Sequence, residues 1–205
     1  MEFYEAVEKR RTVRDFTEKR VPDEILNRIL EAGLKAPSHD HARDWHFVVL
    51  RRPERIAEIL RHVAGGAEVQ TDIINHWNTA TECQKSMYYD ALPKQVKMLS
   101  QSRCLVLPLF RAGADLMTPR DISSLNSFAS VWCLIQNILL AATAEHLVCS
   151  LRIPIRDEES YVLQCVHAPE GYRMPCYLAV GYAAPDAKII RQTELSVAER
   201  IHAES

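Results

Sequence analysis

The feature of this 205-residue chain that most constrains its fold is a long apolar stretch over residues 121–146. A stripe of mostly apolar side chains recurs at steps of three and four residues, which predicts a helix. Further apolar residues, among them Phe128, Leu140 and Ala141, widen this stripe until the helix is apolar almost all round. Such a helix must be enclosed by protein, and a dimer interface is an economical way to enclose it. The recurring positions are Ile122, Leu125, Ala129, Trp132, Gln136, Leu139 and Thr143.

Residues 128–148 are also long and apolar enough to be considered as a membrane span. Polar residues interrupt them, and such side chains are costly in lipid unless they face a partner or a cavity. We therefore favour a buried central helix and expect no membrane partner. The interrupting residues are Ser130, Gln136, Asn137, Thr143, Glu145 and His146.

The overall composition argues against several other classes of protein. The formal charge of −2 gives no reason to expect nucleic acid as a partner, so any phosphate site must be local. The first residues lack the basic and apolar regions of a secretory signal, and the six cysteines show no C-x-x-C pair. We expect a cytoplasmic protein with reduced, mostly buried thiols.

No internal repeat and no Gly/Ser linker divides the chain, so we predict a single domain over residues 1–205. Beside the long helix, the patterns predict helices over residues 3–10, 22–36, 53–65, 157–166 and 194–203. They predict strands over residues 46–50, 104–110, 147–153 and 175–182, the second frayed or at an edge near Pro108. Residues 71–100 indicate one or two helices with a break near Pro93, either a lid or an ordinary peripheral excursion.

Two short stretches indicate a cofactor site. Residues 10–14, Arg-Arg-Thr-Val-Arg, offer three guanidiniums and a hydroxyl, and arginine suits planar, bidentate recognition of phosphate. Residues 36–38, Ala-Pro-Ser, form a small-residue turn before the apolar strand at 46–50. A basic cluster alone is usually a solvated surface, but the pair of stretches indicates a site for a flat, phosphate-bearing cofactor.

With these residues in place, the chain resembles the FMN-dependent nitroreductase superfamily over nearly its whole length. The family's N-terminal basic pattern is matched by residues 10–14, followed by Asp15 and Phe16. Residues 136–142, Gln-Asn-Ile-Leu-Leu-Ala-Ala, are similar to the family's central helix, and residues 180–182, Val-Gly-Tyr, to the end of its last core strand. The order and spacing of these matches carry the resemblance.

The chain also differs from the family pattern at two places. The family turn P-S-x-x-N-x-Q-P-W is represented by residues 37–45, in which only Pro37, Ser38 and Trp45 match and His41 replaces the Asn. After the central helix, His146 stands where the family usually has Gly. These differences bear on contacts with the flavin edge and on substrate choice more than on the fold.

The resemblance implies an α+β fold with a central mixed or antiparallel sheet, flanking helices and a long central helix. It implies an interwoven homodimer that binds one FMN at each of two interface sites, with the C-terminal segment wrapping the partner. Nicotinamide would dock on the flavin itself, and no G-x-G-x-x-G follows a predicted strand. FMN would be the cofactor, with NAD(P)H as reductant.

Specific cofactor contacts follow from the same resemblance. Arg10, Thr12, Lys188 and Arg191 are the expected phosphate ligands, with Arg11 either beside them or an exposed or interface residue. Arg14 would lie beside flavin N1 and the C2 carbonyl and raise the reduction potential; the alternative is a salt bridge to Asp15 or Glu18. Pro37, Ser38, His39 and His41 would come from the other subunit, and Lys188 could instead be a solvated tail residue.

The implied chemistry needs no catalytic side chain, because flavin N5 accepts and donates the hydride. We expect ping-pong transfer from NAD(P)H to a small aromatic acceptor such as a nitro compound or quinone. Reductive dehalogenation and a flavin-binding protein without turnover remain alternatives. A metal site is another, since five candidate ligands crowd together, whereas a catalytic Cys133 or Cys149 is disfavoured by apolar surroundings. The metal candidates are His39, Asp40, His41, Asp44 and His46.

Overall fold

The computed structural model describes residues 1–63 and 77–202. Its α-helices are α1 (Phe3–Lys9), α2 (Asp23–Leu34), α3 (Pro53–Ile59), α4 (Glu82–Ala91), α5 (Lys97–Gln101), α6 (Asn126–Ala144) and α7 (Glu158–Cys165). Its strands are β1 (Trp45–Leu50), β2 (Leu105–Arg111), β3 (Val148–Arg152), β4 (Tyr172–Arg173) and β5 (Tyr177–Gly181).

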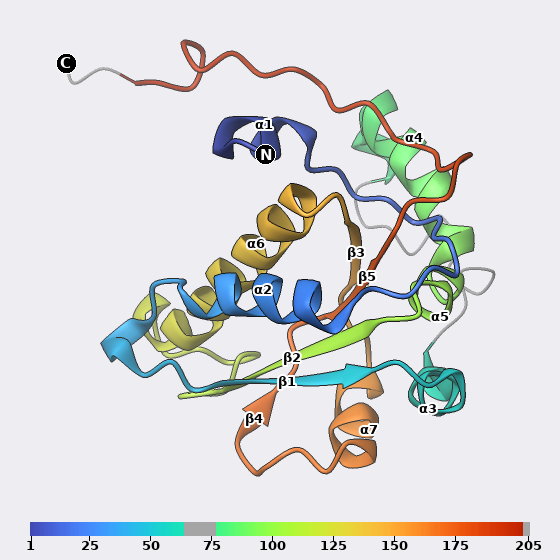
Figure 1. Cartoon of the computed structure of the whole chain (residues 1–205). Coiled ribbons are helices and arrows are strands. Elements are labelled where there is room, and N and C mark those ends of the chain that lie inside the picture. The colour runs from blue at the N-terminus through green and yellow to red at the C-terminus, as the bar shows by residue number, and fades with distance from the viewer. Residues whose placement is uncertain (64–76, 203–205) are drawn as a thin grey trace.

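The strands form one sheet in the order β1-β2-β5-β3, and β4 pairs with the far end of β2. All four strand pairings are antiparallel. Helices α2 and α6 cover one face of the sheet, and α3, α5 and α7 lie on the other (Figure 1). The predicted α+β class, with a sheet flanked by helices, is confirmed.

The side chains of β2 point alternately to the two faces of the sheet, and this explains why helices cover both faces. Val106 and Phe110 of β2 pack into the core with α2 and α6. Leu105, Leu107 and Leu109 pack into the opposite core. Because successive side chains of a strand point to opposite faces, a run without polar residues needs cover on both sides.

β2 lies inside the sheet, but Pro108 itself is paired on one side only, so the predicted break in pairing near this residue is confirmed. Its neighbour β1 pairs along the whole of β2, and Pro108 stands opposite Phe47. On the other side, β5 pairs with Leu105 and Val106, and β4 pairs with Phe110 and Arg111. The proline therefore falls in the gap between two partners, where its missing N–H is tolerated.

The long helix is shorter than predicted at both ends. Asp121 and Ser124 form a capping box for a 3-10 turn over Ile122–Leu125, and α6 begins at Asn126. After α6, His146 adopts a φ of 59°, the left-handed conformation that ends many helices and favours glycine. This explains why the family usually has Gly at the position.

Helix α6 packs closely on α2. An added Cβ on Gly33 of α2 would stand 2.6 Å from Cγ1 of Ile138, so the absence of a side chain allows the two helices to approach. α1 also contacts α6, but the described residues leave part of the opposite face of α6 uncovered. Ala129, Cys133 and Gln136 are exposed there at helical spacing, and Leu140 is half-buried.

Residues 122–144 are long and apolar enough to cross a membrane by length and composition, and 28% of the most apolar window is buried. The core that α6 forms with α2 and the sheet identifies it as a core helix of the domain. Its remaining apolar face is open to a further partner.

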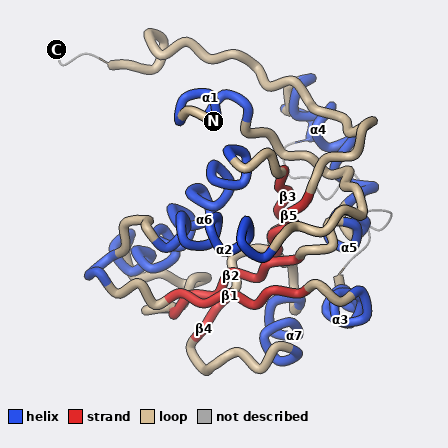
Figure 2. The backbone as a smooth tube through the Cα atoms, viewed as in Figure 1, coloured by secondary structure: helices blue, strands red, loops and turns tan. Residues whose placement is uncertain are grey.

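The predicted helix over residues 194–203 is wrong for the described part, which ends at residue 202. This segment is a loop with one turn, and it runs across the molecule from the side of α4 towards α1 (Figure 2). Its residues are exposed, and a short helix with no face to pack is marginal in water.

The region around residue 93 is confirmed as helical with a break. Helix α4 is followed by a 3-10 turn over Leu92–Lys94 that contains Pro93, and then by α5. Predictions for residues 64–76 lie outside the described residues. The predicted helix from Pro53 ends as α3 at Ile59, followed by a 3-10 turn over Leu60–His62.

Candidate functional site

The N-terminal arginine segment is held at the edge of the sheet. Val13 N donates to the carbonyl of Cys149 in β3 at 3.2 Å, and Thr12 forms a bridge with the same residue. Further along, Thr17 N donates to the Tyr182 carbonyl and Ala184 N donates to the Asp15 carbonyl. These bonds place the segment between β3 and the start of the C-terminal tail.

A cavity of about 200 Å³ lies where this segment meets α4 and the tail. Arg11, Thr12 and Arg14 line it from the N-terminal segment, and Arg191 lines it from the tail. Four of the predicted cofactor residues, distant in sequence, are thus brought together. The remaining lining residues are Cys83, Gln84, Met87, Ile190 and Gln192.

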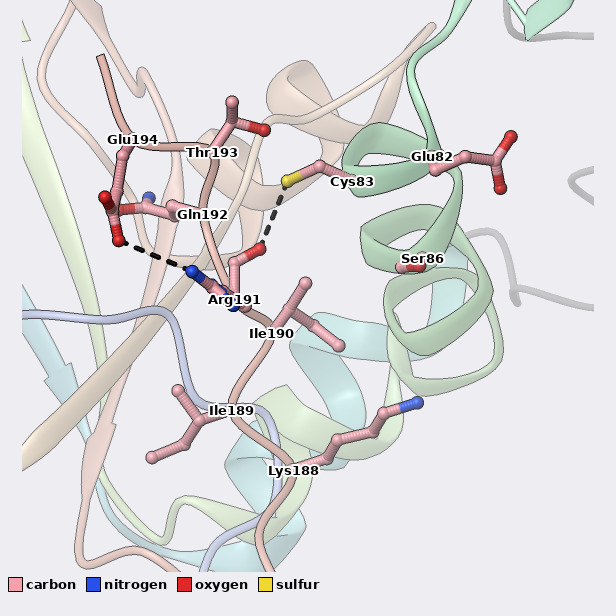
Figure 3. A pocket seen from close by; sticks show the side chains of 10 residues that line it. All are labelled: Glu82, Cys83, Ser86, Lys188, Ile189, Ile190, Arg191, Gln192, Thr193 and Glu194. Atoms are coloured by element: carbon pink, nitrogen blue, oxygen red, sulfur yellow. Dashed lines mark hydrogen bonds and ion pairs between the residues drawn. The ribbon is translucent and has the colours of Figure 1, made fainter. Parts of the chain in front are cut away.

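A larger cavity of about 610 Å³ adjoins the first, since both are lined by Cys83 and Arg191. Figure 3 shows it between α4 and the extended tail, with Lys188 reaching from the tail towards the helix. The Cys83 thiol donates to the Arg191 carbonyl at 3.1 Å, which attaches the tail to α4. Lys188 and Arg191 therefore share one side of the molecule with the arginine segment.

Arg10 and Arg11 differ in their surroundings. Among the described residues, Arg10 lines neither cavity. It lies near Cys149: burial raises the pKa of that thiol to about 12, and the charge of Arg10 opposes the increase. Arg11 lines the smaller cavity, and one of its amino groups donates to the Arg10 carbonyl at 2.7 Å.

Arg14 is nearly buried and pairs with neither Asp15 nor Glu18. Its NH1 donates to Oδ2 of Asp90 in α4 at 3.1 Å. Lys94 donates to the other oxygen of Asp90 and to Asp15, each at 2.6 Å. Burial alone would lower the pKa of Lys94, but its hydrogen bonds to Asp15 and Asp90 raise it. The sequence did not single out Asp90 and Lys94; their i, i+4 spacing across the end of α4 was the available signal.

The other predicted group lies at the start of α6. Ser38 and His39 line a cavity of about 240 Å³ that shares no lining residue with the two arginine-lined cavities. Pro37 and His41 flank it in the same turn, outside the residues that line it. His39 N donates to the hydroxyl of Ser130 at 3.1 Å, which ties the turn to α6.

The backbone of this turn is strained. Asp40, His41 and Arg43 have φ values of 53°, 52° and 46°, a region that favours glycine. Each such residue costs of order 1–3 kcal/mol and persists where its surroundings hold it, commonly at functional sites. Here the Ser38 hydroxyl accepts a bond from Arg43 N at 3.3 Å.

The histidines and aspartates of the turn do not converge as metal ligands. Tyr172 and Arg111 donate hydrogen bonds to Asp44 and lower the pKa of its carboxyl, so both of its oxygens are engaged. In the part of the chain that the structure describes, no three His, Cys, Asp or Glu side chains group as a metal site requires.

The thiols are less uniformly buried than predicted. Cys133 is exposed in the single chain because it lies on the open face of α6, so its predicted apolar surroundings are wrong there. Cys104, Cys149 and Cys176 are buried. Burial raises the pKa of Cys104 to about 11 and that of Cys176 to about 12, values that disfavour a thiolate nucleophile.

The sequence pattern of the nitroreductase family matches residues 7–182. The chain belongs to the nitroreductase family. The matched range includes the arginine segment, the strained turn, α4 and α6. The cavities described above therefore lie within the family's own domain, apart from the tail residues that line them.

Two curated relatives match this chain over short segments. A putative NADH dehydrogenase/NAD(P)H nitroreductase of Methanothermobacter thermautotrophicus is 37% identical over 59 residues, covering 29% of this chain and 31% of the relative. Iodotyrosine deiodinase 1 of Sus scrofa is 44% identical over 62 residues, covering 29% of this chain and 22% of the relative. The matches thus span less than a third of either relative.

Solved structures share the fold over the whole chain. An oxidized iodotyrosine deiodinase bound to FMN and 3-iodo-L-tyrosine superposes with a TM-score of 0.74 at 21% identity, covering 100% of both chains. The FMN- and NADPH-dependent nitroreductase NfnB from Sphigopyxis sp. strain HMH gives a TM-score of 0.72 at 14% identity, also covering 100% of both. At this identity the likeness shows the nitroreductase-like fold.

Proposed function

We propose that the protein is an FMN-dependent oxidoreductase whose cofactor phosphate binds at the arginine-lined cavities. The observation that carries this proposal is the convergence of Arg11, Thr12, Arg14 and Arg191 on one cavity from opposite ends of the chain. The guanidiniums of Arg11 and Arg191 and the hydroxyl of Thr12 can replace the water around a phosphate dianion, which leaves Arg14 for the flavin ring. Lys188 adds a cation in the adjoining cavity, and Arg10 begins the same N-terminal segment.

The size of the cavities supports this cofactor. The two arginine-lined cavities measure about 200 and 610 Å³, and sites for small molecules generally occupy about 300–1,000 Å³. Met87 and Ile190 supply apolar surface beside the cations. A flat, mostly apolar ring with an anionic tail fits this mixture of surfaces.

We infer that the complete site needs a second copy of the chain. The turn that carries Ser38 and His39 lies apart from the arginine-lined cavities in one chain, and the apolar stripe of α6 is open. In a symmetric dimer formed through α6, the turn of one subunit would meet the arginine-lined cavity of its partner. Pro37, Ser38, His39 and His41 then contact the ring from the partner subunit.

When bound, FMN supplies two-electron transfer at its ring, and the protein supplies position and charge. Arg11, Thr12 and Arg191 hold the phosphate and so fix the ring in the site. Arg14 places positive charge at the ring edge where negative charge increases on reduction, which raises the reduction potential. The reductant in this proposal is NADH or NADPH, and the acceptor is a small nitro compound or quinone.

A second candidate acceptor is a halogenated aromatic compound. The 62-residue segment that is 44% identical to iodotyrosine deiodinase 1 and the fold shared with the deiodinase bound to 3-iodo-L-tyrosine favour it. Both candidates need the same cofactor site, and they differ in the acceptor that reoxidises it.

Anaerobic absorbance spectroscopy of the purified protein tests the proposal. We expect a yellow protein with flavin bands that NADH or NADPH bleaches, and whose colour returns when a nitro compound or quinone is added. Recovery with 3-iodo-L-tyrosine and release of iodide would instead select the dehalogenase. A yellow protein that no nicotinamide bleaches would indicate a flavin carrier or another reductant. Protein that is colourless and binds no added FMN would refute the cofactor assignment.

A further inference from the structure

The guanidinium of Arg14 is held at one end only. Among the described residues its sole hydrogen-bond partner is Asp90, 3.1 Å from NH1, and the two side chains are 10% and 2% exposed. A guanidinium has five N–H donors, so four have no hydrogen-bond partner among the described residues, and Arg14 is one of the residues that line the cavity of about 200 Å³. The site therefore contains a buried cation whose orientation depends on one carboxylate.

Asp90 is itself fixed by its neighbours. Its second oxygen accepts a bond from Lys94 at 2.6 Å, and Lys94 donates to Asp15 at the same distance. Since Arg14 and Asp15 are adjacent in the chain, the four residues form a closed ring of alternating charges between the N-terminal segment and the end of α4 with its following 3-10 turn. Pairing of this kind offsets the cost of burying charge, and both carboxylate oxygens of Asp90 are occupied.

We propose that Asp90 is the positioning residue that directs the Arg14 guanidinium into the cofactor cavity. Cys83 and Met87 of the same helix line that cavity, so α4 both closes the site and orients its buried arginine. In this assignment α4 forms one side of the cofactor site. The inference rests on the proposed function, because it gives Arg14 a flavin to act on.

Two roles of Asp90 predict opposite changes in the flavin potential. If the carboxylate acts by position, its loss frees Arg14 to leave the ring edge, and the reduced flavin is stabilised less. If it acts only as a negative charge near the ring, its loss stabilises the reduced flavin more. The sign of the change in midpoint potential therefore separates a positioning role from a purely electrostatic one.

The test measures FMN dissociation constants by fluorescence titration and midpoint potentials of the reconstituted protein. The set is wild type, Asp90→Ala, Asp90→Asn, Arg14→Ala and the Asp90→Ala/Arg14→Ala double variant. We expect Asp90→Ala to weaken FMN binding roughly tenfold and to lower the potential, as Arg14→Ala does. Asp90→Asn keeps an acceptor oxygen and should lie between wild type and Asp90→Ala.

The double variant should be no weaker than Arg14→Ala alone, because Asp90 acts through Arg14. Asp90→Ser, which is polar but too short to reach Arg14, replaces Asp90→Ala if that variant does not fold. The matched control is Glu159→Gln, which breaks the 2.7 Å ion pair with Arg173 far from the cavity and should leave FMN binding unchanged.

Wild-type affinity in Asp90→Ala, or a potential that is unchanged or raised, would overturn the positioning role while leaving the proposed function intact. Additive losses in the double variant would do the same. Wild-type protein that binds no FMN would overturn both, and the wild-type titration alone identifies that case.

Discussion

At the scale of single residues, the two neighbouring arginines of the N-terminal segment are expected to contribute unequally. Arg11 lines the cavity, and Arg10 lies towards Cys149. Arg11→Ala removes a charge-assisted contact, which should cost about 1.5–3 kcal/mol of FMN binding free energy. Arg10→Ala should cost less FMN binding free energy, because Arg10 does not line the cavity and its charge acts on the phosphate from farther away. Isothermal titration with FMN measures both, and a larger loss for Arg10→Ala would reverse the assignment of the two side chains.

The residue scale is also where prediction from sequence had a clear limit. The resemblance selected Arg14, and the alternative partners considered for it were the near neighbours Asp15 and Glu18. The structure pairs it with Asp90, which is 76 residues away. Local spacing carries information about partners within a few turns, whereas a long-range ion pair depends on how α4 packs, which no motif encodes.

At the scale of elements, α4 links both arginine-lined cavities, so its stability should affect cofactor binding. Thr81 caps the helix in a capping box with Gln84, and Gln84 lines the smaller cavity. Thr81→Ala should lower the unfolding free energy by about 0.5–2 kcal/mol and also weaken FMN binding. Thr81→Ser, which retains the cap, is the control. Thermal denaturation with and without FMN checks both effects. An unchanged FMN affinity would show that the start of α4 does not contribute to FMN binding.

The stability that Lys94 gives to the junction of α4 with the N-terminal segment should decrease at alkaline pH. The pKa of Lys94 is raised above its usual value of 10.5 by its bonds to Asp15 and Asp90, despite burial. Its stabilising effect is therefore complete at neutral pH and is lost as pH rises past 10.5 through the higher folded pKa.

Lys94→Met provides the corresponding measurement. This substitution should lower the unfolding free energy by about 1–3 kcal/mol at pH 7, because the ion pairs of Lys94 with Asp15 and Asp90 are only partly exposed. Urea denaturation of both proteins from pH 7 to 11 should show a difference that is constant at first and then shrinks at the alkaline end. A difference that stays constant to pH 11 would show that Lys94 acts through packing.

Most elements could be predicted from their patterns, and the exceptions have physical causes. The positions of Pro22, Pro37 and Pro53 and the apolar runs of β1, β2 and β5 located the flanking helices and the sheet. The last segment looked helical by composition, but it has no packing surface within one chain. Pro108 correctly indicated a break in pairing, but the pattern of one strand does not reveal that β2 is otherwise an interior strand whose partners β4 and β5 leave a gap there.

At the scale of the whole molecule, the open stripe of α6 is the strongest reason to expect a second copy. Ala129, Cys133 and Gln136 are exposed along one face of a helix whose opposite face is core. A charged side chain introduced at the centre of a symmetric interface meets its own copy or is buried without a partner, and either is costly. We therefore expect Cys133→Glu to yield a folded monomer.

The loss of the dimer should also remove the flavin, because the proposed site needs Ser38 and His39 of the partner subunit. Light scattering after gel filtration, with absorbance recorded at the flavin band, measures assembly and cofactor in one experiment. Gln164→Glu on the exposed side of α7 is the matched control and should leave both unchanged. A Cys133→Glu protein that remains a yellow dimer would place the interface elsewhere. A yellow monomer would show that one chain is sufficient to bind FMN, and the turn at residues 37–41 would then lose its proposed role at the ring.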